Sequence, residues 1–129
     1  MTTESGKKRL FVIGSNGYGE LGFNNSERVG QLTPLLDKSI TKAFSGNAYS
    51  IYTNDNFNNI LSAGYNGRGA CGVGNQDIRV EALTPINYFT QNNIQVSNIY
   101  TGVTGYCAFF KDTNGKIYGC GANEKGQLG

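Results

Sequence analysis

The sequence predicts an all-β protein built from four-stranded antiparallel units, and three observations lead to this fold class. First, the 129 residues include 19 glycines and 16 asparagines, which readily adopt the left-handed backbone angles of tight turns. Second, a glycine-rich nonapeptide recurs three times along the chain. Third, short apolar and β-branched runs of strand length lie between polar turn residues.

The nonapeptide has the pattern Gly-x-Asn-x-x-Gly-x-x-Gly, and its copies begin at offsets of 50 and 57 residues. A second motif, Leu-Thr-Pro, follows the first two copies and returns after 51 residues. The repeat is therefore a whole structural unit rather than one loop. The residues that we expect to serve as structural repeat positions are Gly14, Asn16, Gly19, Gly22, Pro34, Gly64, Asn66, Gly69, Gly72, Pro85, Gly121, Asn123, Gly126 and Gly129.

Strand patterns place four strands in the central unit, with parts of a unit on either side. We expect strands at 9–13 and 32–36, then at 41–45, 48–53, 59–63 and 83–89, then at 96–101, 106–111 and 116–120. A four-stranded unit that returns about every 50 residues is typical of a β-propeller blade. The domain organisation is then a flexible N-terminal tail (1–7) and a propeller segment (8–129), divided into a partial blade (8–36), a full blade (41–89) and a partial blade (94–129). This is an incomplete propeller of roughly two and a quarter blades, fewer than the about four to eight that close a ring.

Turn chemistry fixes the register of the last hairpin. Asn114-Gly115 is typical of a type I turn followed by a left-handed glycine, which pairs Asp112 with Lys116 and Cys120 with Ala108. The equivalent turn at 54–56 has no glycine, so we expect one of its asparagines to take the left-handed angle.

The first copy also contains Gly17-x-Gly19-x-x-Gly22, the spacing of a dinucleotide-binding loop. Two observations argue against that function. The third copy replaces the first of these glycines by Glu124, and neither of the first two copies is followed by the apolar spacing of a helix. We therefore expect the glycines to be architectural, and each motif asparagine to hydrogen-bond the loop backbone.

Composition argues against most enzyme chemistry. The chain has no histidine, and its nine acidic residues show no close pairing beyond ordinary turn positions such as Asp55 and Asp112, so we expect no enzyme activity, catalytic residue, metal site or cofactor. The three cysteines, Cys71, Cys107 and Cys120, are expected to be free thiols. A net charge of +2 without a clustered basic patch makes nucleic-acid binding unlikely, and no apolar run is long enough for a membrane span. The N-terminus carries no signal peptide, so we expect the cytoplasm or the nucleus.

The third copy ends in Gly126-Gln127-Leu128-Gly129, and from 8 to 129 the sequence resembles the repeats of the regulator of chromosome condensation (RCC1-type) family. Kelch repeats would need a Gly-Gly pair and WD repeats a tryptophan, and the chain has neither. The resemblance implies a seven-bladed propeller. It also implies either an interaction module or a guanine-nucleotide exchange factor. The founding member is an exchange factor for a Ras-like GTPase, and it also binds chromatin.

The resemblance transfers no exchange residue, because the chain has no wedge insertion and no histidine. Where the family often has a histidine after a strand-end glycine, Tyr49 and Tyr106 stand here, and we expect them to be equivalent packing residues. The leading functional hypothesis is a non-enzymatic protein-interaction scaffold. The alternatives are an exchange factor for a small GTPase and, with less support, a chromatin binder. We expect protein partners, and open blade edges that pair with the missing remainder of a longer propeller.

Overall fold

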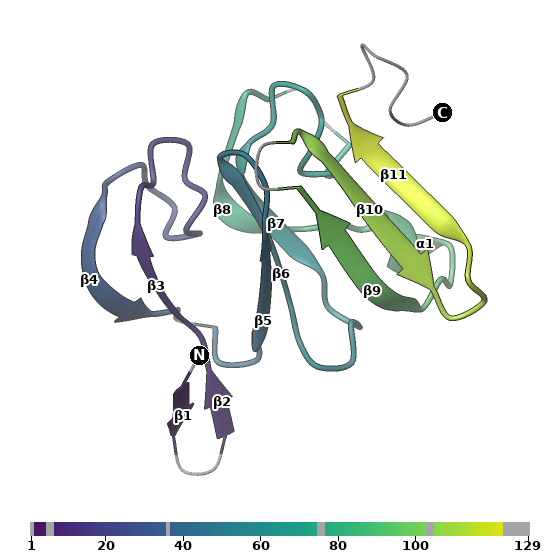
Figure 1. The fold of residues 1–129 in the computed structure, drawn as a ribbon, viewed down its shortest axis with the longest axis horizontal. Helices are drawn as coiled ribbons and strands as arrows, with labels where there is room; N and C mark the ends of the chain where they lie inside the picture. Colours follow the sequence, from purple (N-terminus) through teal and green to yellow (C-terminus); the bar gives the residue numbers. More distant parts are fainter. Residues whose placement is uncertain (1, 5–6, 36, 75–76, 103–104, 123–129) are drawn as a thin grey trace.

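The computed structural model describes residues 2–4, 7–35, 37–74, 77–102 and 105–122. Its strands form four antiparallel sheets that follow one another along the chain (Figure 1). A hairpin of β1 (Thr2–Glu4) and β2 (Lys7–Arg9) comes first, and β3 (Phe11–Gly14) then pairs with β4 (Val29–Pro34).

The central sheet has four strands in sequence order, and the last sheet has three. The central strands are β5 (Lys42–Ser45), β6 (Tyr49–Thr53), β7 (Leu61–Tyr65) and β8 (Arg79–Pro85). The last sheet consists of β9 (Val96–Thr101), β10 (Cys107–Asp112) and β11 (Ile117–Gly121). Nine strands thus occupy the predicted blade positions, and the all-β, partial-propeller prediction is confirmed.

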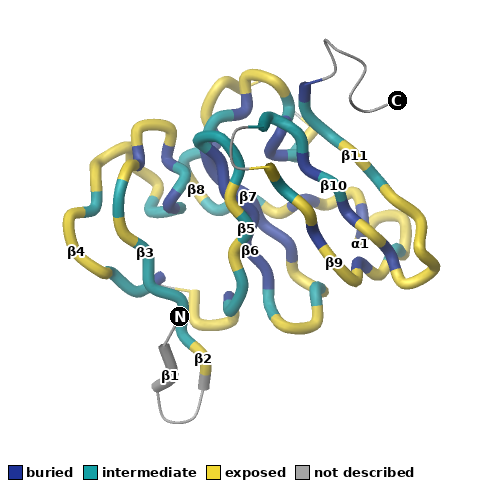
Figure 2. The backbone as a smooth tube through the Cα atoms, in the orientation of Figure 1, coloured by how far each residue is buried: buried dark blue, intermediate teal, exposed yellow. Residues whose placement is uncertain are grey.

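Strand β6 lies at the centre of the fold because neighbouring sheets cover both of its faces. All five of its residues are buried (Figure 2). Tyr49 and Ile51 point into the core shared with the last sheet, and Tyr52 points into the core shared with the first. Burying a side chain of this size contributes roughly 1.5–3 kcal/mol, so β6 helps to hold three sheets together.

The N-terminal segment differs from the expected flexible tail. Residues 2–4 and 7–9 form the β1–β2 hairpin, with Thr2 opposite Arg9. Side-chain contacts attach β2 to the sheets: Lys8 Nζ lies 3.2 Å from an Asp55 carboxylate oxygen, and Arg9 Nη2 donates to the Leu35 carbonyl oxygen at 3.1 Å.

The predicted strand at 83–89 is wrong at both ends. Strand β8 begins four residues earlier and ends at Pro85, and the short helix α1 (Tyr88–Gln91) follows it. The reason is tertiary. The Phe89 ring lies 4.9 Å from the Phe110 ring of the last sheet, so the helical turn places Phe89 in the core shared with that sheet.

Of the two predicted hairpin turns, the structure confirms one and corrects the other. At 112–115 the prediction is confirmed: Gly115 has φ +86°, Ala108 lies opposite Cys120, and the Asp112 N–H donates to the Lys116 carbonyl oxygen at 2.9 Å. In the turn at 54–57 the left-handed residue is Phe57, with φ 54°, and not an asparagine. The Phe57 ring packs 6.3 Å from that of Phe44 and 4.9 Å from Lys42 Nζ, and these contacts favour the strained angle.

Candidate functional site

In the two glycine loops that the structure describes, the motif asparagine binds the loop to the segment that follows it. Asn16 is 1 % exposed, its amide nitrogen donates to the carbonyl oxygens of Asn25 and Glu27, and its Oδ1 accepts from the Leu21 N–H at 2.9 Å. Asn66 makes the equivalent contacts, because it donates to the Asp77 carbonyl oxygen at 3.0 Å and accepts from the Cys71 N–H. Asn123, Gly126 and Gly129 lie outside the described residues.

Three of the motif glycines, Gly19, Gly64 and Gly121, stand where a side chain would meet backbone. Gly64 has φ +118°, and a Cβ there would lie 2.5 Å from the Ala48 carbonyl oxygen. A Cβ on Gly121 would overlap the Tyr106 carbonyl oxygen in the same way. At Gly19, φ +81°, a Cβ would come within 2.5 Å of the Glu81 Cα in the neighbouring sheet. The positive angles and close approaches explain why these positions are glycine. The remaining described motif glycines, Gly14, Gly22, Gly69 and Gly72, also have positive φ.

The two Leu-Thr-Pro motifs end β4 and β8, the last strands of the first and central sheets. Pro34 lies opposite Phe11 and Pro85 lies opposite Leu61. In both, the residue after proline returns a hydrogen bond to the sheet. The Leu35 N–H donates to the Leu10 carbonyl oxygen at 3.0 Å, and the Ile86 N–H donates to the Ile60 carbonyl oxygen at 2.9 Å.

Two buried tyrosines connect neighbouring sheets. The Tyr49 hydroxyl donates to the Cys107 carbonyl oxygen, and the Tyr52 hydroxyl donates to the Glu20 carbonyl oxygen, both at 2.7 Å. Burial raises the pKa of Tyr52 to about 12 and that of Tyr49 further. Both hydroxyls are therefore neutral donors with a packing role.

The expected equivalence of Tyr49 and Tyr106 is wrong. Tyr49 lies opposite Gly64, and Cys107 lies opposite Gly121, so Cys107 is the equivalent of Tyr49. Tyr106 corresponds to Ala48, since each carbonyl oxygen faces a motif glycine. The one-residue difference arises because the chain from Tyr49 to its partner Gly64 is one residue longer than the chain from Cys107 to its partner Gly121.

A row of tyrosines crosses three sheets at the edge where the loops after β3 and β7 lie, the upper edge in Figure 1. We call Tyr18, Tyr65 and Tyr106 the tyrosine row. The Tyr18 and Tyr65 ring centroids are 5.0 Å apart, and those of Tyr65 and Tyr106 are 5.5 Å apart. The Arg68 guanidinium lies 5.2 Å from the Tyr106 ring, and the Arg79 guanidinium lies 5.7 Å from the Tyr18 ring.

All five side chains of this edge are exposed or half-buried. Sequence reasoning missed the row because Tyr18 and Tyr65 occupy variable positions of the nonapeptide, where other copies have serine, alanine, arginine or lysine. The signal in the sequence that could have indicated the row is that a tyrosine stands in one copy of the nonapeptide where the other copies have a different residue. The row presents aromatic faces, hydroxyls and guanidinium groups, which suit binding rather than bond-making chemistry.

The thiols of Cys71 and Cys120 are poor nucleophiles at neutral pH. Burial raises the pKa of Cys71 to about 12 and that of Cys120 to about 11, and all three cysteines are free. Within the described residues, no group of three or more His, Cys, Asp or Glu side chains could hold a metal ion. None of the described helices is long and apolar enough to cross a membrane.

Antiparallel sheets that pack face to face, with this glycine loop between two paired strands of a sheet, resemble the RCC1-type repeats of β-propellers. Comparison with known proteins confirms the resemblance, although no model of a known protein family matches the sequence. The curated "X-linked retinitis pigmentosa GTPase regulator" of Mus musculus is 27 % identical over 128 residues, which are 97 % of this chain and 12 % of that protein. The Homo sapiens protein of the same name is 24 % identical over the same length, again 12 % of that protein.

Solved structures show the same fold. Yeast RCC1 (Prp20), in its complex with Kap60, matches 95 % of this chain and 27 % of its own, with a TM-score of 0.78 and 19 % identity. Human WBSCR16 matches 88 % of this chain and 29 % of its own, with a TM-score of 0.70 and 21 % identity. A structure of Prp20p from Saccharomyces cerevisiae, described with its binding to Gsp1p and histones, has a TM-score of 0.77 and 18 % identity over 94 % of this chain and 28 % of its own.

Proposed function

We propose that the chain is part of a non-enzymatic protein-interaction scaffold in the cytoplasm or the nucleus, and that the tyrosine row is the centre of its binding face. The observation that carries this proposal is the placement of Tyr18, Tyr65 and Tyr106 side by side, from three separate sheets, at one loop edge. Tyrosine and arginine are the residues that most often dominate the energetics of protein interfaces.

The charge distribution supports a protein partner over nucleic acid. The chain has a net charge of +2, and its one run of three basic residues lies in β2. In that run, Lys8 pairs with Asp55, and Arg9 donates to the Leu35 carbonyl oxygen. Binding to the phosphate backbone would need a cluster of basic residues on one face. These observations give chromatin binding the least support of the three candidates.

The internal repeats provide conservative test variants, because other copies show which residues the fold accepts. In Tyr18→Arg, Tyr65→Ala and Tyr106→Ala, each tyrosine is replaced by the residue at the equivalent place in another copy, namely Arg68, Ala122 and Ala48. The combined variant should keep its melting temperature within a few degrees but lose most of the proteins captured from a lysate, as quantified by mass spectrometry. Tyr100→Ser is the control, since Tyr100 lies on β9 and is 46 % exposed. Equal capture by the combined variant and the parent protein would contradict the proposal.

We propose guanine-nucleotide exchange on a small GTPase as the second candidate. Its support comes from the relatives: two are named GTPase regulators, and the Prp20p structure is described with its binding to Gsp1p. The experiment is release of a fluorescent GDP analogue from a panel of Ras-like GTPases, with and without the protein. Exchange activity predicts at least a tenfold faster release from one GTPase. No acceleration across the panel would remove this candidate and leave the scaffold.

A further inference from the structure

We propose that the Asn114-Gly115 turn between β10 and β11 is a modification site, at which the side-chain amide of Asn114 is lost and the turn is rebuilt as aspartate or isoaspartate. The proposal is independent of the tyrosine row. It rests on a comparison of the three Asn-Gly dipeptides of the chain, at 16–17, 66–67 and 114–115. The fold buries the asparagine of the first two and exposes that of the third.

The reaction of an Asn-Gly dipeptide needs only water. The glycine backbone nitrogen attacks the asparagine Cγ, its proton passes through solvent to Nδ2, and Nδ2 leaves as ammonia, so that a succinimide ring forms. Water then opens the ring at either carbonyl. One opening gives aspartate, and the other gives isoaspartate, in which the main chain runs through the former side chain. Glycine favours the attack because it has no Cβ to obstruct ring closure.

The two motif asparagines are held away from this geometry. Asn16 and Asn66 are 1 % and 2 % exposed. The Nδ2 of Asn16, which is the group that would leave, donates to the carbonyl oxygens of Asn25 and Glu27. Its Oδ1 accepts from the Leu21 N–H, and Asn66 is held at both amide atoms in the same way. Attack there requires the glycine loop to unfold, so these two sites are protected by the stability of the core.

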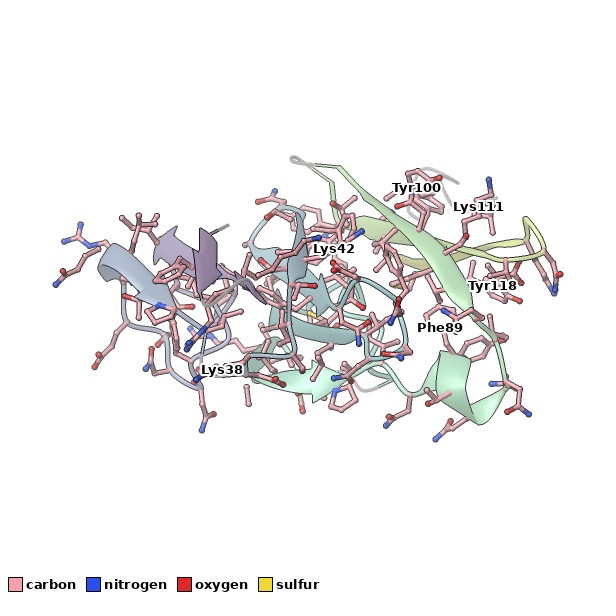
Figure 3. The ribbon with its side chains drawn as sticks, turned by 90° about the horizontal axis from the view of Figure 1, so that it is seen from below. Lys38, Lys42, Phe89, Tyr100, Lys111 and Tyr118 are labelled. Carbon is pink, nitrogen blue, oxygen red and sulfur yellow. The ribbon has the colours of Figure 1, made fainter. Side chains whose placement is uncertain are left out.

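Asn114 has no such hold. Each residue from 113 to 117 is exposed, and the turn projects beyond the labelled Lys111 and Tyr118 at one end of the molecule (Figure 3). The Asn114 backbone N–H donates to the Asp112 carboxylate at 2.9 Å. Its side-chain amide makes no hydrogen bond to the residues that the structure describes. The side chain is therefore free to turn toward its own backbone.

The corresponding turn of the central unit is exposed as well. It runs through 54–57, between β6 and β7, and its Asp55 and Asn56 are exposed. Neighbouring sheets nevertheless pack on both faces of β6. A turn at this end of a sheet thus faces solvent even where the sheet itself is enclosed, so packing between sheets does not cover Asn114.

One hydrogen bond must open before the ring can close. The Gly115 N–H donates to the Asp112 carbonyl oxygen at 3.1 Å, which engages the attacking nitrogen in the turn. Opening this bond disturbs a few exposed residues and no core side chain. Exposed turns open at a much lower free energy than buried elements do. Local opening of the turn therefore sets the rate at Asn114, whereas unfolding of a buried loop sets the rates at Asn16 and Asn66.

The isoaspartate product should loosen the hairpin. The Asp112 carboxylate accepts the N–H groups of Asn114 and Lys116 at 2.9 Å, and the Asp112 N–H donates to the Lys116 carbonyl oxygen at 2.9 Å. Isoaspartate adds one methylene to the main chain inside the ring that these bonds close. It also adds a negative charge close to the Asp112 carboxylate. Because this turn sets the register of β10 against β11, we expect the product to melt at a lower temperature.

The test is ageing of the intact protein at mildly alkaline pH, below its melting temperature. Trypsin places the three dipeptides in separate peptides, 10–28, 43–68 and 112–116. Mass spectrometry then measures amide loss from each, and digestion in water enriched in heavy oxygen marks any loss that occurs during digestion. In the folded protein, peptide 112–116 should lose its amide at least about tenfold faster than the other two, and isoaspartate should form there.

The same measurement in urea is the control for sequence effects. Without the fold, the three dipeptides should react within about threefold of one another. Absence of amide loss at Asn114 in the folded protein would overturn the proposal. So would equal rates at the three sites in the folded protein, or the same order of rates in urea as in the folded protein.

Two variants test the consequence for the hairpin. Asn114→Gln forms the corresponding ring far more slowly, so the aged variant should keep its melting temperature while the aged parent loses a few degrees. Asn114→Asp carries the new charge without the extra methylene and should melt close to the fresh parent. Equal melting of the aged parent and the aged Asn114→Gln variant would overturn the effect on the hairpin. An Asn114→Asp variant that melts as low as the aged parent would overturn the role of isoaspartate.

Discussion

The two interfaces between sheets are built from the same repeat and yet differ in how they are closed. Between the first and central sheets, Leu83 of the fourth strand covers Gly22. Between the central and last sheets, α1 contributes Phe89, and a groove remains beside Gly72. The same motif is thus close-packed in one place and open in the other. The strand that lies on the loop, rather than the sequence of the loop, decides how much space a motif glycine has.

The interfaces also differ at one pair of equivalent positions, Tyr52 in β6 and Phe110 in β10. Tyr52 reaches across the first interface to the Glu20 carbonyl oxygen. The equivalent position in β10 is Phe110, which has no hydroxyl and instead packs its ring 4.9 Å from that of Phe89. Each interface thus has one buried tyrosine hydroxyl that crosses it, Tyr52 in the first and Tyr49 in the second, and the second interface adds the tilted pair of Phe89 and Phe110 rings.

The largest effect should come from placing a methyl group on the equivalent glycines Gly19 and Gly69. Both have positive φ, so Gly→Ala carries a backbone cost of about 1 kcal/mol or more at each position. Only Gly19→Ala also forces a Cβ against Glu81, which should bring its total to about 3 kcal/mol. Urea denaturation of both variants measures the difference. Equal losses would mean that close approach of the fourth strand does not constrain Gly19.

A smaller effect should separate the leucines of the two Leu-Thr-Pro motifs. Leu83 packs against the first core, whereas Leu32 of β4 is 67 % exposed. Leu83→Ala should lower the free energy of unfolding by about 2 kcal/mol, because it removes packed methyl groups. Leu32→Ala should change it by less than about 0.5 kcal/mol. Thermal and urea melts of the two variants provide the measurement. A large loss of stability for Leu32→Ala would contradict the conclusion that Leu83, and not Leu32, contributes to the core.

Tyr52→Phe should make the first interface resemble the second, where phenylalanine already stands at the equivalent place. Loss of the bond to the Glu20 carbonyl oxygen should cost about 1 kcal/mol. Tyr100→Phe serves as the control, since the exposed Tyr100 hydroxyl should contribute little. If the two variants have the same urea midpoint, the cross-interface bond does not stabilise the fold.

The smallest effect concerns pH. Burial raises the pKa of Cys71 from 9.0 to about 12, so the folded state holds this proton more tightly than the unfolded state does. That stabilisation is complete well below pH 9 and is lost as the pH rises through 9 toward the folded pKa. Between pH 7 and pH 9 the loss should be about 0.4 kcal/mol. Cys71→Ala should remove this contribution to the dependence of the unfolding free energy on pH. The first interface has no such contribution, because Leu21 at the equivalent position does not titrate. If urea melts show the same dependence of stability on pH for Cys71→Ala and the parent protein, this prediction is contradicted.

Local turn and repeat chemistry made much of the fold predictable. The number and order of the nine blade strands follow from apolar runs between glycine and asparagine turns, because these patterns act over a few residues. The register of the β10–β11 hairpin follows from Asp112, whose carboxylate accepts the N–H groups of Asn114 and Lys116 at 2.9 Å. Burial by itself would raise the pKa of this carboxyl, but the hydrogen bonds from Lys116, Asn114 and the Tyr118 hydroxyl outweigh it and leave the pKa below its usual value. The carboxylate therefore stays ionised and holds the turn.

The candidate site was less predictable. The sequence marked the motif glycines, but not the tyrosine row, whose members come from three separate units. It also did not indicate that Phe57 would take the left-handed angle, or that Phe89 would lie on a helix. Each of these outcomes depends on a ring or a core contributed by a distant segment.

The sequence by itself therefore determined the repeat, its strands and the places where the backbone must turn, since those depend on backbone angles and neighbouring hydrogen bonds. Only the tertiary structure decided which glycine is crowded, which tyrosines meet and where a groove remains. These features depend on how the sheets pack against one another. Gly19 and Gly69 share one motif and nearly the same φ, and only the strand lying on Gly19 separates them.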